Sequence, residues 1–225
     1  MTAIIAPMTT VPDAAPVLAK NATPEYPIQR IIADRWSPYG FADRAVPETD
    51  LSSLFEAARW SASSYNEQPW TYFVATKKDY SEFQRLLSCL VPANQEWAKA
   101  APVLVLAVVS LRFAKTGKDN HAAVHDLGLA SATLVMEATA RDLSVHQMIG
   151  ILPDTARELY QIPAHHEPWT ALAIGYKAHA DELRDGFHER DLTPRQRKPI
   201  SQFVFSRTWG EPSAFTQTAA VPAKV

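Results

Sequence analysis

The length, composition and charge of the chain set the first limits on what it can be. Its 225 residues, 47% of them hydrophobic, are enough to build one domain with a substantial core. The formal net charge of −2, with charged residues spread along the sequence, provides no basic surface for nucleic acid or for an anionic membrane. Cys89 is the one cysteine, so the chain forms no internal disulfide, and we expect a reducing cytoplasm as its compartment.

The N-terminal region is rich in Ala, Pro and Thr. It lacks the basic stretch and continuous apolar core of a secretory signal peptide. We predict a flexible arm over residues 1–27, a globular domain over 28–210 and a flexible tail over 211–225. The longest apolar stretch, residues 127–136, is well short of the roughly 20 residues that span a bilayer, so we expect no membrane-spanning segment.

The first elements of the domain alternate between helix and strand patterns. A short helix is expected over 26–36, ending at Ser37-Pro38 because proline disfavours helical backbone in the residue before it. Apolar residues repeat with helical spacing over 47–60, which predicts a second helix. A polar loop over 61–68 then leads into the aromatic and β-branched run 70–75, which is typical of a strand.

The central elements carry the strongest apolar patterns. Helices over 77–90 and 94–100 precede residues 102–109, an apolar run that predicts a strand buried on both faces. The longest helix is expected over 120–143, and its wide apolar surface indicates a place at the centre of the domain or between subunits. Further along we expect a strand over 144–149, a helix over 154–160, a buried strand over 169–176 and a last strand over 200–205. The pattern predicts one α+β layer structure in which helices cover a sheet.

Most side-chain patterns that enzymes use for chemistry are missing from the chain. Its seven glycines form no Gly-rich phosphate or dinucleotide loop, and no G-x-S-x-G motif is present. His165 and His166 are adjacent, and His121 and His125 lie one helical turn apart without a third ligand nearby, so we predict no metal site. A bound cofactor is the natural alternative.

Three segments carry the specific signals of the chain. Residues 35–41 read RWSPYGF, residues 58–70 read ARWSASSYNEQPW, and residues 193–199 read TPRQRKP. Together and in this order they resemble three features of the FMN-dependent nitroreductase family, and the resemblance runs from about residue 28 to residue 210. These features are the opening R-x-S-x-R-x-F motif, the A-x-x-x-P-S-x-x-N-x-Q-P-W loop and the basic cluster before the C-terminal extension. Read singly, each segment also fits an ordinary helix end, a polar turn or a solvated face.

The resemblance implies a fold, an assembly and an activity. The fold would be a three-layer α-β-α sandwich with a central mixed sheet, in a homodimer whose C-terminal segments are exchanged. The activity would be that of an NAD(P)H-dependent oxidoreductase that reduces nitroaromatic, quinone or related small organic acceptors by ping-pong hydride transfer. FMN would be the cofactor, with NADH or NADPH as the donor. Because the flavin N5 would carry the chemistry, no catalytic side chain is predicted.

The resemblance also assigns residues to the cofactor. Arg35, Ser37, Arg195 and Arg197 would hold the FMN phosphate, for which guanidinium groups are suited because they donate paired, charge-assisted hydrogen bonds. The loop over 61–68 would reach FMN from the neighbouring subunit, where amide side chains offer both donors and acceptors to the flavin edge and the ribityl hydroxyls. The predicted cofactor-binding residues are Arg35, Trp36, Ser37, Tyr39, Ala62, Ser63, Ser64, Asn66, Gln68, Asn94, Met148, Ile149, Gly150, Arg195 and Arg197.

Three positions depart from the pattern of the family. Tyr39 stands where many members have a second basic residue, which leaves one phosphate contact unassigned. Ala62 replaces the usual proline, which makes the partner-subunit loop less rigid. Trp97 stands where some members have a lysine near the flavin, and we expect it to pack in the core.

Two other functions stay open at this point. Flavin-fragmenting or dehalogenating enzymes share the fold, but they need substrate-clamping segments that we do not identify in this sequence. A flavin-binding protein without nicotinamide-dependent reductase activity would keep the cofactor residues and lack the reaction. Bleaching of the bound flavin by NADH or NADPH distinguishes a reductase from such a binding protein.

Overall fold

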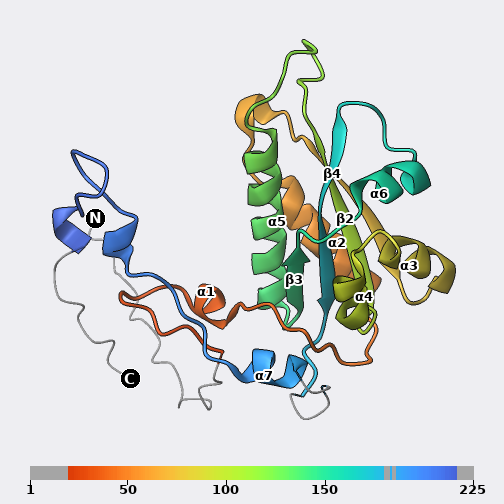
Figure 1. Ribbon diagram of the computed structural model, residues 1–225, viewed down its shortest axis with the longest axis horizontal. Helices are drawn as coiled ribbons and strands as arrows, with labels where there is room; N and C mark the ends of the chain where they lie inside the picture. Colours follow the sequence, from red (N-terminus) through yellow and green to blue (C-terminus); the bar gives the residue numbers. More distant parts are fainter. Residues whose placement is uncertain (1–19, 180–182, 184–185, 217–225) are drawn as a thin grey trace, which may run out of the picture.

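The computed structural model describes residues 20–179, 183 and 186–216, and it has a four-stranded sheet at its centre (Figure 1). The strands are β1 (Trp70–Thr76), β2 (Val103–Ser110), β3 (Ser144–Met148) and β4 (His166–Gly175), in the spatial order β1-β2-β4-β3. All three pairings are antiparallel. The mixed sheet that we predicted is therefore wrong for the four described strands. The further strand expected over 200–205 does not join them.

Helices cover both faces of this sheet. The helices α2 (Glu48–Arg59) and α5 (Ala123–Ala140) cover one face, and α3 (Tyr80–Leu87), α4 (Pro92–Ala98) and α6 (Pro153–Tyr160) cover the other. The short helices α1 (Arg30–Asp34) and α7 (Phe187–Leu192) lie below the sheet in Figure 1. Local signals fix several of their starts: the Asp79 side chain accepts from the backbone N–H of Glu82 at 3.0 Å, and α4 and α6 each begin with a proline. The α+β class and the helical coverage of the sheet are confirmed, and α7 was missed by the sequence prediction.

The strand β2 divides the core into two halves, as its apolar run predicted. Val103, Val105, Ala107 and Val109 face one cluster, which contains Leu54 from α2 and Leu134 from α5. Leu104, Leu106 and Val108 face the other cluster, which contains side chains of α3, α4 and α6. Successive residues of a strand point to opposite faces, so a continuously apolar strand fits only between two covered faces. The molecule is thus a three-layer sandwich.

Close backbone packing fixes the segment that follows α1. Phe41 pairs with Lys177 in an isolated antiparallel bridge, and the backbone N–H of Ala42 donates to the carbonyl of Tyr176 at 2.9 Å. A Cβ atom at Gly175 would lie 2.5 Å from Cδ of Pro102 and 3.0 Å from the Phe41 ring. Only glycine permits this approach, which seats residues 35–41 against the end of β4.

The C-terminal segment leaves the body of the molecule as an arm, which we define as residues 193–216 (Figure 1). Two short 3-10 helices, Ile200–Gln202 and Ala214–Thr216, lie in the arm, so the strand predicted over 200–205 is wrong. A strand needs a neighbouring strand to satisfy its backbone groups, and here the backbone N–H of Val204 bonds locally to Ile200. The arm leaves large apolar side chains in solvent, including Trp209, which is 95% exposed.

Two further features of the described residues bear on the class of protein. None of their helices is long and apolar enough to span a bilayer. Cys89 is completely buried, and burial raises the pKa of its thiol to about 11. A thiol of this kind stays protonated and unreactive at neutral pH.

Candidate cofactor site

Three arginines from two distant segments meet at the base of the arm. Nη1 of Arg35 donates to Oγ of Ser37 at 3.2 Å. The terminal nitrogens of Arg195 donate to the carbonyl oxygens of Ala33 and Arg35, and the charge of Arg197 acts on both of the other arginines. The structure therefore brings together Arg35, Ser37, Arg195 and Arg197 as expected, while their roles toward a ligand stay a prediction.

The electrostatics of this basic cluster favour an anion. Burial, and after it the nearby Arg197 guanidinium, lowers the pKa of Arg35. Burial also lowers the pKa of Arg195, with further lowering by Arg35 and Arg197 and an opposing effect of Asp34. Like charges held this close, partly out of water, are costly until an anion offsets them. The buried Nε of Arg195 has no hydrogen-bond partner among the described residues.

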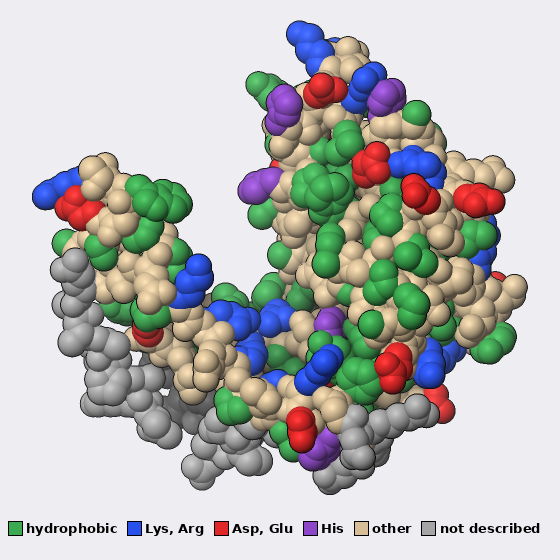
Figure 2. Space-filling model, in the orientation of Figure 1, with side chains coloured by type: hydrophobic (Ala, Val, Ile, Leu, Met, Phe, Trp, Pro, Cys, Tyr) green, Lys and Arg blue, Asp and Glu red, His purple; other side chains and the backbone are tan. Residues whose placement is uncertain are grey.

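The cluster also keeps hydrogen-bond donors for a ligand. A guanidinium carries five N–H donors, and the hydrogen bonds from Arg35 to Ser37 and from Arg197 to the Gln196 carbonyl use one donor each. Figure 2 shows Lys and Arg side chains gathered on the floor of the hollow between the body and the arm. This hollow is where the chain presents positive charge to a ligand.

A buried carboxylate holds the backbone beside Ser37. Asp191, on α7, is only 7% exposed. Its Oδ1 accepts from the backbone N–H of Tyr39 at 3.0 Å, and its Oδ2 accepts from Tyr39 and Gly40, both at 3.1 Å. The sequence prediction missed this residue, because only the fold brings two segments 151 residues apart into contact.

An aromatic cluster lies next to these residues. The Tyr39 ring packs with Trp97, His146 and Phe187, at centroid distances of 5.1, 4.7 and 5.4 Å. Nδ1 of His146 lies 2.9 Å from the carbonyl oxygen of Pro38, which only accepts, so Nδ1 carries the proton and Nε2 is left as an acceptor. Burial lowers the pKa of His146, with Pro38 and Asp191 opposing and Arg35 adding to the effect, which favours the neutral ring. Tyr39 itself carries no positive charge, so one charged contact of the family motif stays unassigned.

Asn94 and Gly150 form the far side of the same surface. Nδ2 of Asn94 donates to the Gly150 carbonyl at 2.9 Å, and its Oδ1 accepts from Nε1 of Trp97 at 3.3 Å. A Cβ atom at Gly150 would lie 2.5 Å from the Asn94 amide, so only glycine fits here. Met148 is buried, whereas the Ile149 side chain is 72% exposed. Trp97 is buried in the core, as expected.

The loop over 61–68 lies at the opposite end of α5. The backbone N–H of Ser64 donates to Oδ2 of Asp126, in the first turn of α5, at 2.9 Å. Ser63, Asn66 and Gln68 bond mainly within the loop, and Ala62 is exposed on it. Figure 1 shows α1, which precedes Arg35, beside the end of α5 that leads into β3. Eighteen residues of helix separate these ends by about 27 Å. Within one chain, the loop and the basic cluster are therefore not brought together.

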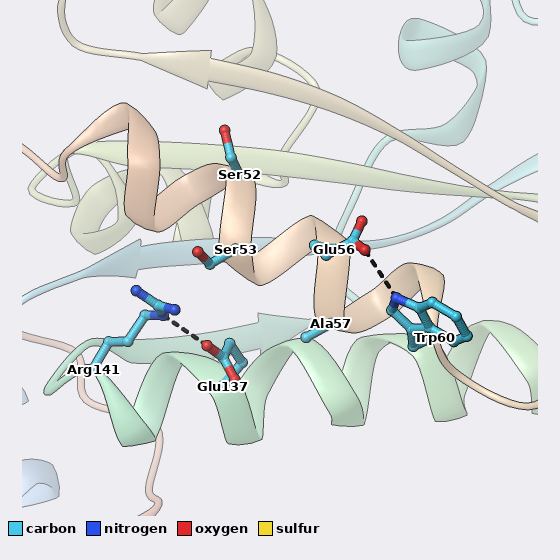
Figure 3. A pocket seen from close by; sticks show the side chains of 7 residues that line it. All are labelled: Ser52, Ser53, Glu56, Ala57, Trp60, Glu137 and Arg141. Atoms are coloured by element: carbon cyan, nitrogen blue, oxygen red, sulfur yellow. Dashed lines mark hydrogen bonds and ion pairs between the residues drawn. The ribbon is translucent and has the colours of Figure 1, made fainter.

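A groove between α2 and α5 is lined by none of the predicted site residues (Figure 3). Its volume is about 570 Å³, and its lining is Ser52, Ser53, Glu56, Ala57, Trp60, Glu137 and Arg141. The charged groups are already paired: Arg141 with Glu137 at 2.7 Å, and Glu56 with Nε1 of Trp60 at 2.8 Å. The groove therefore presents few charged groups that lack a partner within the chain.

Metal-binding chemistry finds no site in the described part of the chain. No group of three or more His, Cys, Asp or Glu side chains there is placed to hold a metal ion. His125 lies against the neighbouring carboxylate, with its Nδ1 3.2 Å from Oδ1 of Asp126.

The fold and the basic cluster define an α+β protein with a site suited to an anionic ligand. The sequence profile of the nitroreductase family matches residues 32–176, and the chain belongs to that family. A solved structure described as an oxidoreductase containing FMN is 30% identical, with a TM-score of 0.77, over 82% of this chain and 93% of that one.

Two relatives known from sequence are also similar to this chain. A provisionally named NADH dehydrogenase/NAD(P)H nitroreductase of Methanothermobacter thermautotrophicus is 24% identical over 161 residues, which are 69% of this chain and 80% of that protein. An uncharacterized protein of Mycolicibacterium smegmatis is 31% identical over 130 residues, which are 56% of this chain and 84% of that protein. A nitroreductase-family structure from Clostridium difficile, 21% identical over 79% of this chain and 96% of that one, with a TM-score of 0.61, shares the fold.

Proposed function

We propose that the protein is an FMN-dependent NAD(P)H oxidoreductase that reduces nitroaromatics, quinones or related small organic acceptors. The observation that carries the proposal is the convergence of Arg35, Ser37, Arg195 and Arg197 in a chain of the nitroreductase family. The FMN-containing oxidoreductase and the provisionally named nitroreductase among its relatives support the cofactor and the donor.

The residues at the base of the arm fit the phosphate group of FMN. A phosphate dianion needs several charge-assisted donors, and the cluster offers three guanidinium groups and a hydroxyl. One of the guanidinium groups, that of Arg195, has a buried Nε without a partner among the described residues. Arg35 and Arg197 have donors left for the phosphate, whereas Arg195 mainly ties the arm to the end of α1. Asp191 holds Tyr39 and Gly40 so that the backbone after Ser37 is already ordered.

The surface from Tyr39 to Gly150 fits the ring end of the cofactor. Bound FMN would supply the electron-carrying ring that accepts a hydride from the nicotinamide and reduces the acceptor. Asn94 fixes the Gly150 backbone, and the exposed Ile149 borders the open side of this surface. The task of these residues is to position the ring and limit the access of water, because the bound ring itself would carry the electrons.

We further propose a homodimer in which the loop over 61–68 of one subunit completes the site of the other. The loop and the basic cluster lie at opposite ends of α5, so one copy does not place both on one ligand. Leu129 on α5, Trp60 at the end of α2 and the aromatic side chains of the arm are exposed apolar groups that a partner would cover. A chain ending at residue 199 should lose dimerisation and flavin in light scattering and visible absorbance. A full-length monomer with full flavin occupancy would contradict the dimer.

Stopped-flow absorbance tests the activity. The purified protein should be yellow, and mixing it with NADH or NADPH without oxygen should bleach the flavin band rapidly. A colourless protein that does not take up FMN would overturn the proposal. A yellow protein that neither nicotinamide bleaches would instead be a flavin-binding protein of the same fold.

Steady-state kinetics test whether donor and acceptor use one pocket. Since the oxidised nicotinamide must leave before the acceptor enters, double-reciprocal plots at several fixed acceptor concentrations should be parallel. Intersecting plots would show that both substrates bind together.

The unreactive single thiol is compatible with the reducing cytoplasm that we propose as the compartment.

A further inference from the structure

Residues 20–25 run across the base of the arm, and they bond both to the end of α1 and to the arm itself. The backbone N–H of Ala22 donates to the Ala33 carbonyl at 3.0 Å, near the end of α1. The backbone N–H of Ile200, in the arm, donates to Oε2 of Glu25 at 3.2 Å. These bonds connect the N-terminal segment to the two parts of the chain that carry the arginines.

The side chain of Lys20 lies among the residues of the basic cluster. Its Nζ donates to the Arg190 carbonyl at 2.5 Å and lies 5.3 Å from the centroid of the Trp36 ring. Trp36 stands between Arg35 and Ser37 in the sequence. Burial lowers the pKa of Lys20, Asp191 raises it, and the charge of Arg195 lowers it again. The ammonium group is thus a fourth cation at the place where three guanidinium groups already meet.

We propose that Lys20 provides a phosphate contact of the cofactor site, in place of the basic residue that Tyr39 does not provide. This inference rests on the proposed function. An ammonium has three N–H donors, of which the Arg190 carbonyl takes one, and its flexible stem lets the charge reach a phosphate. Lys20 lies outside residues 32–176, where the family profile matches, and outside the three segments that resemble the motifs of the family.

A second role would also explain the bond to Arg190, and it must be separated from the first. Arg190 lies in the last turn of α7, where a cation near the free carbonyls stabilises a helix end. If this were its whole role, Lys20 would hold α7 and so Asp191, and the loss of its charge would affect the site regardless of whether the ligand carries a phosphate. Riboflavin, which has the ring and ribityl chain of FMN without the phosphate, distinguishes the two roles.

The experiment compares full-length Lys20→Gln, Lys20→Arg and the matched control Lys78→Gln, which removes an exposed lysine paired with Glu48 at 2.9 Å. Dissociation constants for FMN and riboflavin are measured by flavin fluorescence on each apoprotein. Lys20→Gln should weaken FMN binding by about tenfold and leave riboflavin binding within about twofold. Lys20→Arg should retain most of the FMN affinity, and Lys78→Gln should match the unaltered chain.

The remaining outcomes overturn the inference. Equal weakening for FMN and riboflavin would assign Lys20 to the support of α7, and unchanged FMN binding would remove it from the site. If Lys20→Gln does not fold, the rise in the unfolding midpoint on adding inorganic phosphate is compared between the unaltered chain and Lys20→Met, and an equal rise in the two would also overturn the inference. Arg35→Ala measured in parallel keeps the two proposals apart: if it weakens FMN binding while Lys20→Gln does not, the proposed function stands and only the role of Lys20 fails.

Discussion

The two ends of α5 hold the two groups of predicted cofactor residues in different ways. At the end that leads into β3, contacts between distant segments organise the site: Asp191 bonds to Tyr39, and Arg195 bonds to the carbonyl of Arg35. At the other end, the loop over 61–68 is held mostly by bonds among its own residues, and Asp126 fixes the backbone of Ser64. The end of α5 that leads into β3 is therefore charged and held by bonds between distant segments. The end beside the loop is polar and held mainly by local bonds.

In the dimer that we propose, the two motifs of one binding site would come from different chains. The backbone of the loop adopts left-handed conformations at Tyr65, Asn66 and Gln68, with φ of 53°, 56° and 53°. Residues other than glycine adopt these conformations at a cost, so the loop shape is specified although no ligand-binding group of the same chain lies beside it. The dimer that we propose would place a second copy of the chain against this loop.

The largest effect should come from mixing two defective subunits. Arg35→Ala impairs one end of α5 and Asn66→Ala the other, so each homodimer alone should lose flavin. In a heterodimer purified through two different tags, one site carries both changes and the other carries neither. About half of the wild-type flavin should return, because the two sites of a symmetric dimer become unequal.

The same experiment has a clear contrary result. If each site were built within a single subunit, both sites of the heterodimer would carry one change and no flavin would return. A heterodimer of Arg35→Ala with Arg197→Ala serves as the control. Both of its changes affect the same end, so neither site is restored in the proposed arrangement.

The next effect concerns the charged end alone. Arg197→Ala and Arg35→Ala should each weaken FMN binding by about tenfold or more, since a charge-assisted hydrogen bond contributes about 1.5–3 kcal/mol. Isothermal titration of the apoprotein measures this change, and Lys78→Ala, which removes an exposed cation paired with Glu48, is the control. Unchanged affinity in both variants would remove these arginines from the site.

A smaller effect should follow from Asp191→Asn. The amide keeps one oxygen for the backbone N–H groups of Tyr39 and Gly40 but loses the charge, so the free energy of unfolding should fall by about 1–2 kcal/mol. Urea denaturation measures the loss, and Asp154→Asn, on the exposed start of α6, is the matched control. If the two variants lose the same stability, Asp191 does not hold the loop after Ser37.

The smallest effect is a pH dependence at His146. Burial holds the pKa of the folded ring below its ordinary value of 6.5, so above that pH both folded and unfolded chains are neutral and the residue adds no pH dependence. As the pH falls through 6.5, the unfolded chain binds a proton that the folded protein does not, and the free energy of unfolding falls. His146→Gln should flatten this slope between about pH 6.5 and 5, by less than about 1 kcal/mol in total. Parallel curves for the two proteins would exclude the effect.

The sequence predicted the parts of the fold that local patterns determine. The apolar run of β2 required two covered faces, and Pro92 and Pro153 stand at the starts of the helices expected nearby. The composition of residues 200–205 predicts a strand, but the segment contains a 3-10 helix instead. A strand forms only beside a neighbouring strand, and none of the described strands pairs with this segment. Helix α7 was missed because Phe187–Leu192 is short and mostly polar.

The same distinction applies to the candidate site, where some residues stand in sequence motifs and others depend on contacts that only the fold makes. Arg35, Ser37, Arg195 and Arg197 were found because they stand in recognisable motifs, and the structure gathers them. Asp191, His146 and Lys20 carry no motif, since each matters through a contact with residues far away in the sequence. Sequence patterns therefore identify residues that stand in a motif more readily than residues whose position depends on the fold.

The buried thiol of Cys89 has a practical consequence for measuring how two copies assemble. It is the single cysteine of the chain, and its inaccessibility leaves no background for maleimide or nitroxide reagents. Ser206→Cys on the arm, or Ser61→Cys at the start of the loop, would then provide the sole site of labelling. Distances between spin labels on the two copies would report the path of the arm directly, in otherwise unaltered protein.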